Sequence, residues 1–381
     1  MIMDVTGISL TLLIGPTIPA PAPQFVTEAL ERVSVTHTDR GPSGFQLEFK
    51  ADRTSSFLRD FQLLAMRVLA TGNRVVLMVT IGGMPRVLMD GFITHIELSH
   101  SKASGASTIS VTGEDVSVKM DLIELSEGHP GLGHFAIVDT ILAKYARYGV
   151  APMVIPTSSN LASNPLERVP QQNATDRDYI NSLAGLHGNV FLVRPGPAPM
   201  TNIAYWGPPP RVGAPLATLT VDMGPSTNVE SISFSYDGLA PTLFLGLDQD
   251  AETETDIPIA TLTGDRVPLA VESPLLFNQG LLKTKVVKTP GLTAGDALAY
   301  VQGMTDRSLD NVLTAQGEVD TLRYGSIMDV PGLVGVRGCG MSLDGFYYVK
   351  SVTHSLSRGA YRQQFSLSRE GLGTTTPVVP P

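Results

Sequence analysis

The residue types best suited to chemistry are sparse in this chain. The single cysteine, Cys339, lies between Gly338 and Gly340. A nucleophilic thiol needs a general base beside it, and no recognisable partner accompanies Cys339. A small, buried apolar residue near a turn is the interpretation we favour. One cysteine also excludes a disulfide framework within the chain and any multi-cysteine zinc or iron–sulfur site.

The histidine spacing does not match a helical metal site. His95 and His100 are five residues apart, as are His129 and His134, whereas two ligands on one helical face need a spacing of four. We therefore expect solvated or singly hydrogen-bonded histidines and no metal ligands.

Five acidic residues alternate with other residues between Asp248 and Asp256. In an extended segment they would project from one face, and clustered carboxylates could bind calcium. An EF-type loop beginning at Asp248 would need Gly and Glu where Thr253 and Ile259 stand. We expect an exposed segment that binds no metal tightly.

Two further features could bind ligands. Tyr205 and Trp206 lie near prolines and could stack on a sugar or a peptide, or pin their loop to the core. Lys283, Lys285 and Lys288 are the only short basic cluster, too little to track nucleic-acid phosphates.

Catalytic signatures are missing from the sequence. It contains no Gly-x-Ser-x-Gly elbow, no Walker loop, no His-Glu-x-x-His and no Gly-x-Gly-x-x-Gly after a strand. We predict that the chain is not an enzyme and has no catalytic, cofactor-binding or metal-binding residues. Its 36 acidic residues leave open a carboxylate pair of the kind that cleaves cell-wall glycan.

Composition limits the class of protein. The 381 residues carry a formal charge of −9, and 43% of them are hydrophobic, so the chain can bury a core. Only 17% are charged, which indicates that partners cover part of the surface. No run of about 18 apolar residues indicates a membrane helix. The apolar start lacks the basic residues of a signal peptide, since the first is Arg32, and it predicts an opening strand instead.

The many glycines and prolines favour short strands and turns, with a few helices that must hold the strands in place. We predict helices over Ser55–Leu69, over Phe135–Tyr145 with a stop at Gly149, after the capping box Thr175–Asp178, and after a second box at Thr293 and Asp296. Most of the remaining periodic segments read as strands, including 75–79, 86–97, 107–112, 189–193, 216–221, 229–236, 312–321, 345–356 and 361–369.

A weak internal repeat accompanies this pattern. Asp90-Gly91-Phe92 precedes a Thr-His pair and a strand, and Asp344-Gly345-Phe346 does the same. Either two copies of one β module or chance accounts for it.

The order of segments resembles the central hub proteins of contractile tails: the phage late-control D family, the N-terminal half of the type VI secretion spike protein VgrG, and hubs of extracellular contractile injection systems. The similarity is clearest in the capped helix beginning at Thr175 with the strand Phe191–Val193, and in the C-terminal run from Gly332 to Arg369.

The resemblance implies a mainly β fold with minor α, an α+β class, built from two tube-protein-like β-barrels and an inserted α+β middle region. Residues 1–125 would form the first barrel, 212–240 with 290–370 the second, 126–211 with 241–289 the middle region, and 371–381 a flexible tail. The chain has no room for a fused spike or a peptidoglycan-cleaving domain after the second barrel.

The implied function is a structural baseplate hub. Three copies would present six barrels to a hexameric inner tube above, hold a separate trimeric spike below and contact other baseplate components, without nucleic-acid binding or a membrane span. Assembly would occur in the bacterial cytoplasm, as part of a virion tail or injection particle. The alternatives are a cell-wall glycan hydrolase at a tail tip and a carbohydrate- or peptide-binding β module.

Overall fold

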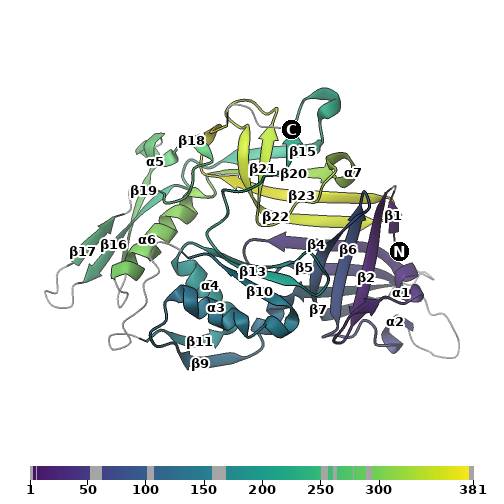
Figure 1. The fold of residues 1–381 in the computed structure, drawn as a ribbon. Helices are drawn as coiled ribbons and strands as arrows, with labels where there is room; N and C mark the ends of the chain where they lie inside the picture. The colour runs from purple at the N-terminus through teal and green to yellow at the C-terminus, as the bar shows by residue number, and fades with distance from the viewer. Residues whose placement is uncertain are drawn as a thin grey trace.

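The computed structural model describes residues 3–5, 7–51, 62–100, 107–156, 169–249, 256–260, 264–277, 279–288 and 294–376. Strands dominate these residues and helices are few (Figure 1). The predicted mainly β, α+β fold class is confirmed.

The first third of the chain forms one curled antiparallel sheet, here called the first unit. Its strands are β2 (Ile8–Gly15), β4 (Leu30–Thr38), β5 (Gly44–Ala51), β6 (Arg74–Ile81), β7 (Met84–Ser99) and β8 (Ser107–Asp115). They lie in the spatial order β2-β6-β7-β8-β5-β4. Alternate residues of β4, β5 and β8 are buried, which is the period expected of a sheet with one face on a core.

A second unit is assembled from two separated parts of the chain. Its strands are β14 (Leu216–Thr220), β15 (Val229–Tyr236), β20 (Leu313–Asp320), β21 (Gly332–Arg337), β22 (Gly345–Ser357) and β23 (Ala360–Arg369). Their spatial order is β14-β21-β22-β23-β20-β15. If the six strands of each unit are numbered 1 to 6 along the chain, the spatial order in both units is 1-4-5-6-3-2. The units differ in one pairing, since β14 runs parallel to β21 whereas β2 runs antiparallel to β6.

The two units also share the positions of two bulges. The second strand carries one extra residue, Glu31 in β4 and Glu230 in β15, as the register shifts against β5 and β20 show. The fifth strand does the same at Thr94 in β7 and Lys350 in β22. Bulges redirect a strand and are specific features of a fold, so two matches indicate equivalent strands.

The bulges correct the repeat seen in the sequence. Counting back from Thr94 and Lys350, Gly91 corresponds to Tyr347 rather than to Gly345. The shared Asp-Gly-Phe tripeptide therefore does not occupy equivalent positions, although the units that contain it repeat in strand order.

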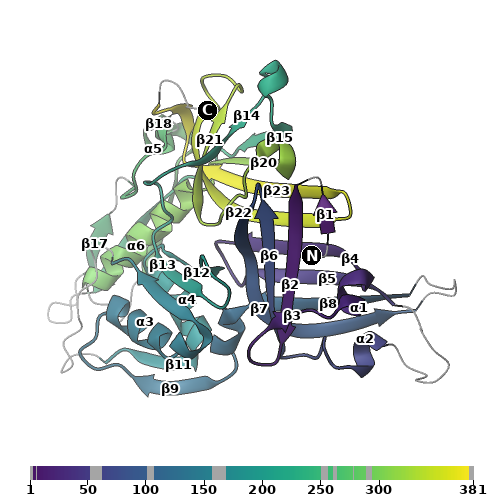
Figure 2. The same ribbon diagram turned by 45° about the vertical axis from the view of Figure 1, so that its right-hand side comes forward.

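One strand pairing joins the two units into a continuous sheet. β4 pairs antiparallel with β22, with Val35 opposite His354 and Ser34 opposite Ser355. We call this pairing the seam. Figure 2 shows β22 and β23 beside β4 and β5, although almost 300 residues separate them along the chain.

The middle region packs two helices against a small sheet. Its elements are β9 (Glu124–Gly128), α3 (His134–Ala143), β10 (Val150–Val154), β11 (Gln171–Thr175), α4 (Asp176–Leu186), β12 (Val190–Pro195) and β13 (Asn202–Gly207). The predicted N-cap is confirmed, because the Thr175 hydroxyl oxygen accepts a hydrogen bond from the Asp178 N–H at 3.2 Å. Gly149, with φ +81°, ends the turn after α3, as predicted.

A further layer is inserted between the second and third strands of the second unit. It contains β16 (Thr242–Gln249), β17 (Asp256–Ala260), β19 (Lys283–Lys288) and α6 (Ala294–Leu309). The helix α6 packs on β16 and contacts α4, so it covers this layer, although the sequence assigned 290–370 to a barrel. The domain boundaries as a whole stay a prediction.

Short elements complete the described chain. They are β1 (Met3–Val5), β3 (Ala20–Pro21), α1 (Gln24–Ala29), α2 (Gln62–Ala65), β18 (Ala270–Glu272), α5 (Pro274–Phe277), α7 (Thr321–Tyr324) and β24 (Leu372–Thr374).

The helix predicted over Ser55–Leu69 is confirmed over α2 (Gln62–Ala65) and wrong beyond it. α2 ends at Ala65, and Arg67 adopts φ +53°, which a continuing right-handed helix does not allow. Residues 52–61 of that prediction lie outside the described residues.

Buried ion pairs attach the layers to each other. Arg74 on β6 binds both carboxylate oxygens of Asp90 on β7, at 2.7 and 2.8 Å, and donates to the Tyr148 carbonyl. The Asn202 amide of β13 also donates to Asp90. Since Arg74, Asp90 and Asn202 are all buried, the first unit is held on the middle region by a buried polar contact.

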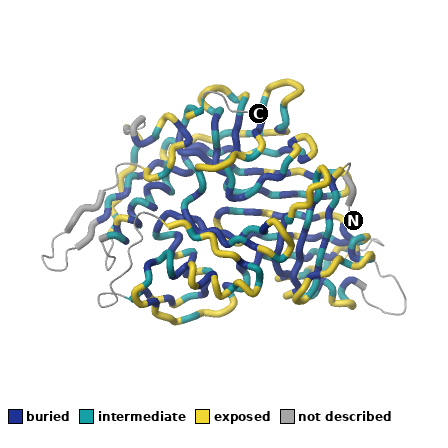
Figure 3. Tube along the Cα trace, in the orientation of Figure 1, coloured by how far each residue is buried: buried dark blue, intermediate teal, exposed yellow. Residues whose placement is uncertain are grey.

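A second network fixes α6. Arg211 pairs with Asp310 and Glu370, both at 2.8 Å, and Arg266 pairs with Asp310 and donates to the Gly188 carbonyl. These contacts tie α6 and the end of β23 to the middle region. Figure 3 shows that buried positions run through the strands of both units and their junction.

Candidate functional site

The most extensive candidate surface is the solvent-facing side of the shared sheet. The buried residues of its strands alternate with short polar residues that face away from both cores. These polar residues are Ser34, Thr36, Gln46, Ser110, Thr112, Ser231, Ser233, Ser235, Thr314, Gln316, Thr353, Ser355, Gln364 and Ser366. We call this surface the polar face.

The polar face crosses the seam without interruption. The hydroxyl oxygens of Thr36 on β4 and Thr353 on β22 are hydrogen-bonded at 3.0 Å. Within the first unit, the Gln46 amide donates to the Ser110 hydroxyl at 3.0 Å. Cross-strand polar pairs of this kind stabilise a sheet without adding charge to its surface.

Ion pairs neutralise several charges on this surface. Arg32 lies 3.5 Å from Glu48, and Arg362 lies 2.6 Å from Glu318 and 3.9 Å from Glu230. Hydrogen bonds from Gln364 and Arg362 lower the pKa of Glu318, so that carboxylate stays ionised and paired. Short hydroxyls and paired charges therefore make up much of the described part of the polar face.

The sequence interpretation missed this face. Its signal is present in the alternation Ser231, Ser233, Ser235 and in Thr353, Ser355, Ser357, where hydroxyl residues occupy every second strand position. The alternation was used only to predict strands, because a hydroxyl residue carries no chemical signature by itself.

Cys339 lies in the turn after β21. Its backbone N–H donates to the Asp344 carboxylate at 2.7 Å. Burial, with the nearby Asp344 charge, raises the pKa of its thiol to about 11. At neutral pH it is a thiol rather than a thiolate. The residue lies near a turn, as predicted, but it is half-buried rather than buried.

The histidines are held in separate contacts. His129 stacks on Tyr179 with ring centroids 5.7 Å apart, and the ring nitrogens of His134 and His187 are hydrogen-bonded at 2.9 Å. His95 lies exposed on β7. Within the described part of the chain, no group of three or more histidine, cysteine or acidic residues could hold a metal ion.

The acidic segment lies largely outside the described residues. The backbones of Asp248 and Asp256 belong to β16 and β17, where Gln249 is opposite Asp256. Residues 250–255 are not described, so the predicted exposure of the carboxylates stays a prediction. The three lysines of the basic cluster lie exposed on β19, which pairs with β16.

The structure contradicts a stacking role for the aromatic pair. Trp206 is 1% exposed and Tyr205 4%, and both lie on the central strand of the middle sheet. The Trp206 indole N–H donates to the Ile180 carbonyl at 3.4 Å, and the Tyr205 hydroxyl donates to the Pro208 carbonyl. Trp206 packs in the core of the middle region, which leaves no ring face for a sugar or peptide. Tyr205 packs with Val190 and Leu192 and lines a cavity of about 640 Å³, but at 4% exposure its ring offers little surface for stacking.

Asp115 has the pKa expected of a catalytic acid but the contacts of a structural one. Burial raises its pKa to about 6. Its carboxylate oxygens accept hydrogen bonds from the backbone N–H groups of Ser43 and Ser117, both at 2.7 Å. It therefore fixes the end of β8 and the turn after β4.

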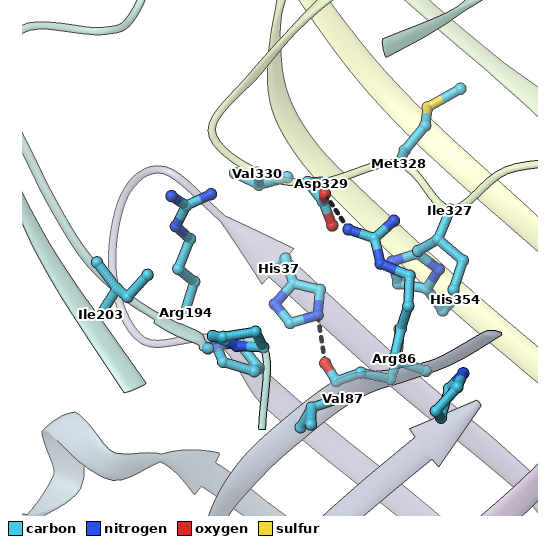
Figure 4. A pocket seen from close by; sticks show the side chains of 15 residues that line it. His37, Arg86, Val87, Arg194, Ile203, Ile327, Met328, Asp329, Val330 and His354 are labelled. Carbon is cyan, nitrogen blue, oxygen red and sulfur yellow. Dashed lines mark hydrogen bonds and ion pairs between the residues drawn. The ribbon is translucent and has the colours of Figure 1, made fainter. Parts of the chain in front are cut away.

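A cavity of about 330 Å³ opens beside the seam (Figure 4). His37 and His354 meet there from β4 and β22, with ring centroids 5.6 Å apart. His37 shares a hydrogen bond with the Leu88 carbonyl at 2.8 Å, and Arg86 pairs with Asp329 at the rim. Burial lowers the pKa of both imidazoles, so they are neutral and pack as part of the seam.

Comparison with known proteins identifies the fold. No family model matches the sequence, and no curated protein matches it. Among solved structures, a tail protein from Neisseria meningitidis is similar over 96% of this chain and 98% of its own, with a TM-score of 0.65 and 15% identity. This chain has the fold of phage tail proteins.

Two other structures agree. A 43 kDa tail protein of prophage MuSo2 from Shewanella oneidensis is similar over 95% of this chain and 98% of its own, with a TM-score of 0.64 and 15% identity. An Escherichia coli component of the type VI secretion system, described as structurally similar to T4 bacteriophage tail proteins, is similar over 92% of this chain and 77% of its own, with a TM-score of 0.54 and 12% identity. The resemblance to tail and spike-related proteins is thereby confirmed at the level of the fold.

Within the described residues, none of the helices has both the length and the apolar character needed to cross a membrane.

Proposed function

We propose that this chain is a structural baseplate hub of a phage tail or contractile injection particle and that it is not an enzyme. It forms a homotrimer between a hexameric inner tube and a separate trimeric spike, and also contacts other baseplate components. The observation that carries the proposal is the repeated strand order of the two units, joined by a seam. The similarity to tail proteins along nearly the whole chain supports the same role.

The repeat explains how such an adaptor works. One chain supplies two similar units in a row, so three chains supply six, which matches a six-fold partner on one side and a three-fold partner on the other. The polar face then lines the passage, and its hydroxyl groups let material pass without a strong binding site. We place its assembly in the bacterial cytoplasm, before it joins the tail or particle.

The test is the mass of the purified chain in solution, measured by light scattering alone and after addition of its inner-tube protein. We expect a trimer, and in the presence of tube protein a complex with three copies of this chain. A monomer under both conditions overturns the proposal. Clearing of a peptidoglycan suspension by the pure chain, lost on substitution of one Asp or Glu, would overturn the statement that it is not an enzyme.

A further inference from the structure

The β4–β22 seam within the chain is a template for strand pairing between two copies of the chain. Two edges of the shared sheet are left without a strand partner among the described residues. One is β15, which pairs only with β20. The other is β7 beyond its bulge, where residues 95–99 pair with β8 alone.

These two edges are the counterparts of the strands that form the seam. β15 is the second strand of its unit, as β4 is of the first, and β7 is the fifth strand of its unit, as β22 is of the second. In the seam, β22 uses the same edge for β21 before its bulge and for β4 after it. On the corresponding edge, β7 pairs with β6 as far as Phe92. The residues of β7 after its bulge have no strand partner on that edge, whereas the equivalent residues of β22 pair with β4.

We infer that a second copy of this chain docks here, with its β15 pairing antiparallel to β7 as β4 pairs with β22. The inference rests on the proposed function and adds the edges and the register. Because each copy presents one edge of each kind, the contact is head to tail, and three such contacts close the proposed trimer into a ring.

The bulges set the register without any free choice. Counting from the bulges Thr94 and Lys350, Glu97 takes the place of Thr353 and Ser99 the place of Ser355. Counting from Glu31 and Glu230, Ser233 takes the place of Ser34 and Ser235 the place of Thr36. The seam pairs Thr353 with Thr36 and Ser355 with Ser34. Glu97 is therefore opposite Ser235 of the second copy, and Ser99 is opposite its Ser233.

The same register aligns the apolar side chains of the two edges. It places Ile96 opposite Tyr236, where the seam pairs Val352 with His37. It places Leu98 opposite Phe234, where the seam pairs His354 with Val35. Those four seam residues are buried, at 0 to 8% exposure. Ile96, Leu98 and Phe234 are only half-buried, and Tyr236 is 43% exposed. Docking would cover apolar groups that the single chain leaves in water.

The outer residues fit as well. Glu97 would accept a hydrogen bond from the Ser235 hydroxyl where the seam has the Thr36–Thr353 bond, and Ser99 would meet Ser233 where the seam has two serines. The polar face would then continue from one copy to the next.

Disulfide cross-linking tests the register directly. Directly opposite Cα atoms in an antiparallel sheet are about 4.5–5.5 Å apart and can be bridged, whereas diagonal neighbours at about 7–8 Å cannot. In a Cys339→Ser background, Ser99→Cys with Ser233→Cys and Glu97→Cys with Ser235→Cys should each shift the non-reduced chain to two and three times its mass. The exchanged pairs, Ser99→Cys with Ser235→Cys and Glu97→Cys with Ser233→Cys, should remain largely monomeric.

The seam supplies the matched control. Ser34→Cys with Ser355→Cys has the same geometry within one chain and should form a disulfide without any rise in mass, which shows that the fold and the oxidation are intact. A trimer by light scattering in which only the exchanged pairs cross-link, or none does, overturns this register and leaves the proposed trimer standing. A monomer by light scattering overturns both.

Discussion

β22 and β7 occupy the same place in their two units, yet their surroundings differ. Beyond its bulge β22 is covered on both edges, and Val352, His354 and Leu356 are at most 4% exposed. Beyond its bulge β7 has a strand partner on one edge only among the described residues, and Ile96 and Leu98 are half-buried. The same local geometry therefore has two outcomes, and the difference is the presence of a neighbouring unit. The comparison teaches that equivalent strand edges of the two units differ in their pairing. The edge of β22 pairs with a strand of the same chain, whereas the edge of β7 has no described strand partner.

The largest expected effect comes from breaking the contact that holds the first unit on the middle region. Asp90→Ala leaves the buried Arg74 guanidinium without its carboxylate, and losing one partner of a buried pair costs about 3–5 kcal/mol. Denaturant unfolding followed by tryptophan fluorescence measures this, because Trp206 lies in the middle region. Glu48→Gln, which removes the exposed pair with Arg32, should cost less than about 1 kcal/mol. Equal losses for both variants would contradict the assignment of Asp90 as a structural tie.

The second prediction compares the paired edge of β22 with the unpaired edge of β7. Leu356→Ala removes a side chain that is 4% exposed in the seam and should lower the free energy of unfolding by about 2–5 kcal/mol. Leu98→Ala, on the open edge, should cost the single chain clearly less and instead weaken its self-association. Unfolding at low protein concentration and light scattering at high concentration separate the two effects. A Leu98→Ala variant as destabilised as Leu356→Ala under dilute conditions would argue that the β7 edge is already covered.

The third effect is a pH dependence of the seam. Burial lowers the pKa of His354, and the groups around it are His37, Tyr361, Arg86 and Asp329. The unfolded chain binds protons below its ordinary pKa of 6.5 while the folded chain does not. The free energy of unfolding is therefore fully present above that pH and decreases by about 1.4 kcal/mol per pH unit per histidine as the pH falls.

Chemical unfolding at a series of pH values between 7 and 4 tests this dependence. His354→Gln should flatten the slope, whereas the same change at the exposed His95 should leave it unaltered. A slope that does not respond to His354→Gln would mean that other groups carry the acid sensitivity.

The smallest effect is expected from the acidic segment. Exposed charges are screened beyond about 10 Å at 0.1 M salt, so replacing its five acidic residues by Asn or Gln should leave the melting temperature nearly unchanged. The change could still weaken docking to a basic baseplate component, with an effect that fades as salt rises. A large calcium-dependent rise in melting temperature, lost in the variant, would instead reveal a metal site.

The sequence by itself determined the local elements. The periodicity of residues 229–236 and 345–356, the cap at Thr175 and the glycine at 149 specified strands and helix ends that the structure confirms, because these depend on neighbouring residues only. It also indicated the tail-protein resemblance, which depends on the order of segments. The failure at Arg67, where a helical pattern stops early, shows how tertiary packing overrides local preference.

Only the tertiary structure decided which edges meet. The seam pairs residues 32–38 with 351–357, and no local property of either segment marks the other as its partner. The equivalence of the two units is recorded in bulges and strand order, whereas the repeated tripeptide in the sequence is out of register. The polar face arises in the same way, because single serines and threonines carry no signal until pairing places them on one side of one sheet. Backbone hydrogen bonding between distant strands is independent of side-chain identity, and this is why the sequence predicted the strands but not the joint between them.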